Sequence, residues 1–337
     1  NEIKLRTLYV GVCGTDKEIV LGKLPFARPE YGDSLVLGHE ALAMVEDPGD
    51  SKIFRKGDVV VPMVRRPGKC KMCSIGRWDY CEDGDFVESG IRGKNGFMRE
   101  EFYDEDRYLV KVREKDLDIL VLTEPLKNVM KMVEIFGFLE KRLPWYCDDS
   151  TYTCKNLYVF GTGPEGLLIS SVFKHIGFNV IAVNRHPPTE TVAKFLEINK
   201  VDYLDTSNES IEDKVRKYPM DFAIDAVGSM EIMYTISKNI KNNGIVLLFG
   251  TSGQLLNGNK DFITDIVDKN LLIAGSTDGS KQNYVEAVNF IEENGMRLGF
   301  NILITKYFKF QELESMDLVK FFTEKEKNEI KKVIRFK

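Results

Sequence analysis

Three residues near the start of the sequence carry side chains that bind transition metals: Cys13, His39 and Glu40. A thiolate, an imidazole and a carboxylate form a donor set that suits zinc and leaves one coordination position for a substrate. Each residue type is ordinary alone, since a single cysteine is usually a small buried side chain and a single glutamate is usually exposed. The chain has 3 histidines in all, so one that stands between a glycine and a glutamate favours a metal site.

A second group of candidate ligands consists of Cys70, Cys73 and Cys81, which lie close together in the sequence. This spacing is typical of a metal site rather than of the disulfide framework of a secreted protein. A closed structural zinc site has four protein ligands, and Asp83 or Asp85 is the candidate for the fourth. The alternative is a metal-free lobe that packing alone holds together.

A glycine-rich turn predicts a dinucleotide site, because it follows an apolar strand and opens a helix. The first glycine allows a tight turn, the second lets a pyrophosphate approach the backbone, and the third lets helix and strand pack closely. The helix N-terminus then binds the phosphates. The alternative is a glycine-rich connector without a ligand. The turn consists of Gly161, Thr162, Gly163, Pro164, Glu165 and Gly166.

The residues after the second predicted strand favour NADP over NAD. An NAD site usually carries an Asp or Glu here, which binds the ribose 2′-hydroxyl, but this chain has Asn184, Arg185 and His186. Asn184 can hydrogen-bond a hydroxyl or a phosphate, and Arg185 adds a planar cation suited to phosphate oxygens. His186 is either a neighbour of the 2′-phosphate or an exposed loop residue. We therefore expect NADP as the preferred cofactor, with NAD tolerated.

Composition limits the class of protein. The 337 residues suit two domains, and 43% apolar with 29% charged residues is typical of a soluble globular chain without a membrane span. A net charge of -5 argues against nucleic acid and favours a small solute as the partner. The metal spacing of the other cysteines favours a reducing cytoplasm, and no secretory signal is visible. Cys147 and Cys154 lack such spacing and are expected to be ordinary packed or partly exposed thiols.

The elements that position these residues predict an α/β fold with two domains. From Asn156 onward, short apolar strands alternate with helical stretches, which predicts a doubly wound parallel sheet of the Rossmann type over 146–278. Residues 1–145 read as a β-rich catalytic domain with a cysteine-rich excursion, which residues 279–337 complete by folding back. The predicted strands are 157–160, 180–183, 222–225, 245–249 and 271–274, and the predicted helices include 165–175 and 231–241.

Several segments, in this order, resemble the zinc-dependent medium-chain dehydrogenase/reductase family, and within it most closely the archaeal glucose dehydrogenases of the Thermoplasma and Sulfolobus type. The resemblance spans nearly the whole chain. It implies a GroES-like catalytic domain, a Rossmann domain, a homo-oligomer (tetramer or dimer) and oxidation of an aldose, D-glucose or D-galactose, at C1 with NADP or NAD. The segments are 12–16, 36–40, 65–70, 96–99, 124–126, 161–164 and 183–185.

The resemblance also implies roles for individual residues. Cys13, His39 and Glu40 match the zinc ligands, and Glu124 matches a carboxylate that reaches the metal directly or through water. Thr15 matches a hydroxyl that contacts the sugar and relays its proton. The sugar-contacting positions also include His39, Glu88, Asn128 and Asp278. The remaining cofactor-contacting positions are Phe249, Gly250, Thr251 and Lys325.

The chain departs from the family in two ways, and two other functions compete. The first cysteine of the family's structural zinc motif is replaced by Pro67, so Cys70, Cys73, Cys81 and Asp85 form the expected set. The resemblance also implies that about 25 residues precede Asn1 in relatives. The alternatives are a polyol, alcohol or threonine dehydrogenase of the same family, and a nucleotide-binding protein without catalysis.

Overall fold

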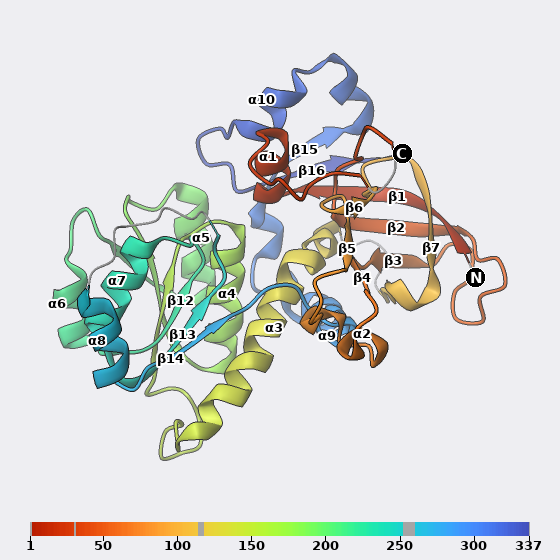
Figure 1. Ribbon diagram of the computed structural model, residues 1–337. Coiled ribbons are helices and arrows are strands. Elements are labelled where there is room, and N and C mark those ends of the chain that lie inside the picture. The colour runs from red at the N-terminus through yellow and green to blue at the C-terminus, as the bar shows by residue number, and fades with distance from the viewer. Residues whose placement is uncertain (1, 30–31, 114–117, 252–259, 337) are drawn as a thin grey trace. The chain divides into compact units, whose positions relative to one another are not determined.

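The structure is a computed structural model that describes residues 2–29, 32–113, 118–251 and 260–336. The chain forms two compact units (Figure 1). The first contains residues 1–130 together with 278–337, and the second contains residues 131–277. The sequence placed the first boundary at 145, whereas the structure places it inside the long helix α3 (Thr123–Leu139).

A seven-stranded sheet organises the first unit. Six strands follow the order β15-β16-β1-β2-β3-β8, and β7 pairs with the N-terminal half of β1. Because β16 pairs with the C-terminal half of β1, residues from both ends of the chain share one sheet. The strands are β1 (Glu2–Val12), β2 (Glu40–Asp47), β3 (Val59–Pro62), β7 (Glu101–Glu105), β8 (Leu109–Lys111), β15 (Ile304–Lys309) and β16 (Lys331–Arg335).

Alternating side chains explain how this sheet buries a core. Ile3, Leu5 and Val10 of β1 are fully buried, and their neighbours in the strand are more exposed. They pack with Val45 and Phe102 from the adjacent strands. The smaller elements of the unit are the three-stranded sheet β4 (Arg65–Arg66), β5 (Val87–Ser89) and β6 (Gly93–Lys94), and the helices α1 (Gly14–Val20), α2 (Lys71–Ser74), α9 (Lys281–Phe290) and α10 (Leu318–Thr323).

The second unit is a parallel six-stranded sheet in the order β11-β10-β9-β12-β13-β14, so the predicted doubly wound α/β fold is confirmed. Helices α4 and α5 cover one face, and α6, α7 and α8 cover the other (Figure 1). Both faces are covered, which is why β9 and β12 are buried at every position. The strands are β9 (Asn156–Phe160), β10 (Asn179–Asn184), β11 (Asp202–Asp205), β12 (Met220–Asp225), β13 (Ile240–Leu248) and β14 (Leu272–Gly275). The helices are α4 (Pro164–Ile176), α5 (Glu190–Asn199), α6 (Ile211–Lys217), α7 (Met230–Asn239) and α8 (Lys260–Asp268).

Two cysteines of the second unit correct the expectation of free thiols. Cys147 and Cys154 form a disulfide that closes the loop before β9. The loop also anchors itself through Trp145, whose ring packs edge-on against Phe136 at 5.5 Å. The sequence argument failed because it treated cysteines without metal-site spacing as ordinary thiols, whereas their short separation lets a loop bring them together.

We expect the disulfide to stabilise the second unit modestly, because closing so short a loop removes little freedom from the unfolded chain. Cys154→Ser should lower the free energy of unfolding by roughly 2 kcal/mol. Chemical denaturation with and without reductant measures this. A reductant should bring the wild type close to the variant, and a wild type whose stability ignores the reductant would contradict the prediction.

The sequence predicts a chain without a membrane-spanning segment. Within the described ranges, no helix combines the length and the apolar character that crossing a membrane requires.

Candidate active site

The three candidate zinc ligands meet in the first unit. Cys13 follows β1 and forms the N-cap of α1, and His39 and Glu40 lie at the start of β2. Antiparallel pairing of β1 with β2 brings these segments together, and one ligand atom from each residue lies within 4.8 Å of the other two. His39 and Glu40 are buried, and Cys13 is half-buried. A sulfur, a nitrogen and an oxygen donor grouped this closely form the kind of ligand set that binds zinc.

Asp16 orients the imidazole of His39, a role that sequence reasoning missed. Its Oδ2 accepts a hydrogen bond from the Cys13 backbone N–H at 2.9 Å, and its Oδ1 lies 3.5 Å from His39 Nδ1. Burial lowers the pKa of His39, but the negative charge of Asp16, with a further contribution from Cys13, raises it well above its usual value. A carboxylate behind a ligating histidine fixes its ring orientation. The three-residue spacing from Cys13 to Asp16, typical of an N-terminal capping box, was the available signal.

Lys331 binds the carboxylate of Glu40. Its Nζ lies 2.6 Å from Oε1 and 2.7 Å from Oε2, and the two side chains are 1% and 0% exposed. Lys331 is the first residue of β16, which the sheet places beside β1. Gly11 leaves room for this pair, since a Cβ there would stand 2.2 Å from Glu40 Oε2. Each carboxylate oxygen has two lone pairs, so Glu40 can hold the ammonium group and still face the metal.

Thr15 lies beside the cluster, whereas Glu124 contacts a different charged group. Glu124 is buried at the start of α3, and its Oε1 lies 3.2 Å from Lys127 Nζ. The cluster of mutually close ligand atoms contains Cys13, His39 and Glu40 but not Glu124, within the described part of the chain. The hydroxyl oxygen of Thr15 lies 3.8 Å from Cys13 Sγ. The part that Glu124 and Thr15 play in binding and proton transfer stays a prediction.

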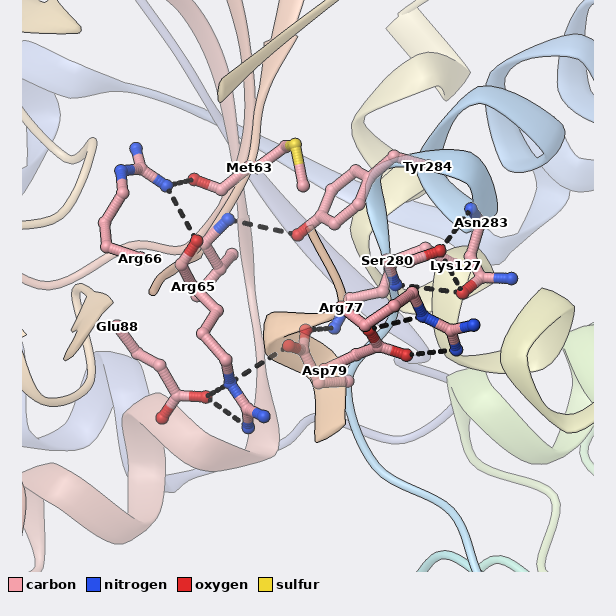
Figure 2. Close-up of polar contacts among 12 residues, drawn as sticks. Met63, Arg65, Arg66, Arg77, Asp79, Glu88, Lys127, Ser280, Asn283 and Tyr284 are labelled. Atoms are coloured by element: carbon pink, nitrogen blue, oxygen red, sulfur yellow. Dashed lines mark hydrogen bonds and ion pairs between the residues drawn. The ribbon is translucent and has the colours of Figure 1, made fainter. Parts of the chain in front are cut away.

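Two of the predicted sugar contacts meet at one arginine (Figure 2). Arg65 donates hydrogen bonds to Glu88 Oε1 from Nε (3.1 Å) and Nη2 (2.9 Å), and its Nε lies 3.0 Å from Asp278 Oδ2. Lys127 donates to Asp278 Oδ1 at 2.6 Å. Asn128, the third predicted contact, is buried with no hydrogen-bond partner for its Oδ1 among the described residues.

The cysteine lobe gathers its three thiols. One sulfur each from Cys70, Cys73 and Cys81 lies within 4.8 Å of the others. Backbone N–H groups of Cys73 and Glu82 lower the pKa of Cys70 to about 7, which favours the thiolate that binds metals. Asp85 is not within that distance of all three sulfurs, but its Oδ1 lies 3.4 Å from Cys81 Sγ. The structure therefore favours Asp85 over Asp83 as the fourth ligand.

The glycine-rich turn has the geometry that phosphate binding requires. Gly161 adopts φ 102°, which favours glycine, and a Cβ at Gly166 would stand 2.1 Å from the Gly161 carbonyl oxygen. Around Gly163, the N-cap of α4, a Cβ would meet nothing within 4 Å, so the approach to the helix N-terminus is open. The residues between them are Thr162, Pro164 and Glu165.

A cavity of about 450 Å³ in the second unit contains the predicted selectivity residues. Asn184 and Arg185 line it, together with Gly161. Asn184 Nδ2 donates to Thr162 Oγ1 at 2.6 Å, so this side chain also braces the turn. His186 is exposed and does not line the cavity. Two acidic residues that the sequence reasoning missed also line it, Glu212 and Glu231.

The remaining predicted cofactor residues lie elsewhere. Phe249, Gly250 and Thr251 follow β13. Gly250 lies so close to the backbone of Val227 that a Cβ at Gly250 would stand 2.1 Å from the Val227 carbonyl carbon. Lys325 lies just beyond α10 in the first unit, and its contribution to cofactor binding stays a prediction.

Two family models together match nearly the whole chain. Residues 1–114 match the model of the alcohol dehydrogenase GroES-like domain, and residues 117–336 match that of the glucose dehydrogenase C-terminus. The chain belongs to the glucose dehydrogenase family of zinc-dependent medium-chain dehydrogenases. The GroES-like and Rossmann assignments are thereby confirmed.

Members of the glucose dehydrogenase family resemble the chain over most of its length. It is 43% identical to glucose 1-dehydrogenase of Thermoplasma acidophilum over 85% of this chain and 80% of that protein. It is 42% identical to that of Metallosphaera sedula over 87% of this chain and 80% of that protein. A structure of Haloferax mediterranei glucose dehydrogenase in complex with NADP, zinc and gluconolactone matches with a TM-score of 0.86 at 27% identity, over 100% of this chain and 92% of that one.

Proposed function

We propose that this chain oxidises D-glucose, and less readily D-galactose, at C1 to the aldonolactone, with transfer of hydride to NADP. The observation that carries the proposal is the close grouping of Cys13, His39 and Glu40. The relatives named glucose 1-dehydrogenase support the substrate, and the Haloferax complex with gluconolactone supports the product.

Each group of residues has its own role in the proposed reaction. Cys13, His39 and Glu40 would hold a zinc ion, which supplies Lewis acidity to the C1 hydroxyl when bound. Thr15 can pass the hydroxyl proton outward, and Glu40 or Glu124 can receive it. Glu88, Asn128 and Asp278 can orient the sugar through its other hydroxyls. In the second unit, the turn Gly161–Gly166 binds the pyrophosphate, and the cofactor accepts hydride.

The experiment is NADP reduction with glucose, galactose, xylose, sorbitol and simple alcohols, with and without a zinc chelator. We expect reduction with aldoses that the chelator abolishes and that added zinc restores. Reduction with sorbitol or alcohols but not aldoses would instead assign a polyol or alcohol dehydrogenase. Binding of NADP without any reduction would assign a non-catalytic nucleotide-binding protein.

Arg185 should distinguish the two cofactors. We expect Arg185→Ala to raise the KM for NADP roughly 10-fold to 100-fold, because it removes a charged hydrogen bond to the 2′-phosphate. The KM for NAD should change less than about twofold, since NAD lacks that phosphate. Arg216→Ala is the control, because Arg216 is an exposed arginine of the same unit that pairs with Asp213. Equal effects on both cofactors would overturn the assignment.

We further infer a second, structural zinc held by Cys70, Cys73, Cys81 and Asp85. The grouped sulfurs and the short distance from Asp85 to Cys81 support it.

From the family resemblance, we infer a cytoplasmic homo-oligomer, a tetramer or dimer. Light scattering on the purified protein would test the oligomeric state.

A further inference from the structure

A buried cluster of charged side chains lies in the first unit, and we call it the Arg65 cluster. It contains two cations, Arg65 and Lys127, and three carboxylates, Glu88, Glu124 and Asp278. The relative exposures of Arg65, Lys127 and Asp278 are 7%, 3% and 6%. Burying a charged side chain costs free energy unless an oppositely charged partner compensates it. Either the ion pairs of the cluster fully compensate this cost, or the charges serve a function other than packing.

Lys127 joins Glu124 of α3 to Asp278, which lies before α9. Arg65 joins Glu88 of β5 to the same Asp278. Its guanidinium also lies 3.8 Å from the centre of the Phe86 ring, which fixes its plane. Figure 2 shows the Arg65 side chain extending to Glu88 on one side and into the centre of the cluster on the other. A planar fork held in this way gives each carboxylate one orientation.

Glu88 and Asp278 each keep an oxygen that receives no hydrogen bond from the described residues. Both hydrogen bonds from Arg65 to Glu88 fall on Oε1, and within the described residues no hydrogen bond reaches Oε2. The Glu88 side chain is 15% exposed, so a ligand can reach it. Asp278 Oδ2 is ion-paired with Arg65 in a geometry that does not form a hydrogen bond, so it is buried without a donor among the described residues.

We propose that Arg65 is a positioning residue for the substrate: it holds Glu88 and Asp278 so that their remaining oxygens accept hydrogen bonds from two hydroxyl groups of one aldose. The inference rests on the proposed function. Acceptors fixed by a shared cation discriminate among sugars, because a hydroxyl of the wrong orientation leaves a buried acceptor unpaired. Arg65 therefore determines sugar preference without touching the sugar.

The test compares Arg65→Gln and Arg65→Lys with Arg66→Gln. Arg66 is the neighbouring residue, is equally buried at 7% exposed, and pairs with Asp104 instead. We expect Arg65→Gln to raise the KM for glucose roughly 10-fold to 100-fold and to narrow the preference between glucose and galactose. The KM for NADP should stay within about twofold. Arg66→Gln should lower the melting temperature but leave the KM for glucose within about twofold.

Arg65→Lys keeps the charge but replaces the fork with a single ammonium group, so it should raise the KM for glucose by a smaller factor. If Arg65→Gln does not fold, Arg65→Lys decides, and an unchanged KM and sugar preference would overturn the proposal. A double-mutant cycle adds a readout that a purely structural role would not move. The effects of Arg65→Gln and Glu88→Gln on the KM for glucose should be strongly non-additive, and additive effects would overturn it.

The outcomes separate this proposal from the proposed function. If the wild type oxidises aldoses and the Arg65 variants keep its KM values, the positioning role is wrong and the function stands. If the wild type oxidises no aldose, the function itself is wrong.

Discussion

Removing the candidate catalytic ligands should abolish activity while the fold persists. Cys13→Ser combined with His39→Ala takes two of three donors from the cluster, and a metal contributes several kcal/mol to the barrier, so kcat/KM for glucose should fall at least about a thousandfold. Elemental analysis should find one zinc fewer per chain, with two in the wild type and one in the variant. Circular dichroism should show the secondary structure of the wild type.

The control for that experiment is Cys154→Ser, which makes the same cysteine-to-serine change outside the cluster. It should retain both metals and full activity. If the double variant keeps its metal content and oxidises glucose at the wild-type rate, Cys13 and His39 are not the ligands. A wild type with one zinc that the double variant loses would confine metal binding to Cys13, His39 and Glu40 and leave the cysteine lobe metal-free.

Lys331→Met should cause the largest loss of stability. The substitution leaves the Glu40 carboxylate buried without its cation, and breaking a buried pair in this way costs about 3–5 kcal/mol. Denaturant unfolding of the zinc-free wild type and variant measures this loss in the free energy of unfolding. Added zinc should recover part of the loss, because a metal that binds only the folded chain stabilises it.

Two further variants test the cause. Lys331→Met with Glu40→Gln removes both charges and should restore much of the lost stability, since a neutral amide is cheaper to bury than a carboxylate. Lys306→Met breaks a surface pair with Glu326, which lies in the segment between α10 and β16, and should have a much smaller effect. If Lys331→Met unfolds at the same denaturant concentration as Lys306→Met, the buried pair does not carry the expected energy.

The sequence was most informative where function depends on local spacing. Gly161 and Gly166 act within one turn, and Cys13 and His39 carry rare side chains in recognisable runs, so their predicted grouping or geometry could be read directly. The alternation of apolar strands and helices similarly predicted the parallel sheet of the second unit, because each βαβ step is local.

The interactions that the sequence could not predict join distant segments. Lys331 and Glu40 are 291 residues apart, and the Arg65 cluster draws on β4, β5, α3 and the segment before α9. Nothing in the local pattern of a lysine or an arginine indicates which carboxylate it will meet. The Cys147–Cys154 disulfide was missed for another reason, because two cysteines without metal-site spacing were taken as ordinary thiols and the loop geometry was not considered.

The sheet that joins both ends of the chain also sets an order for biosynthesis. Glu40 is synthesised 291 residues before Lys331 of β16, its buried cation. Until β16 docks, that side of β1 is an open sheet edge, and the metal site contains an uncompensated carboxylate that water must solvate. The second unit can fold meanwhile, because residues 131–277 are continuous. A nascent chain is therefore ready for nucleotide before its catalytic unit can close around metal.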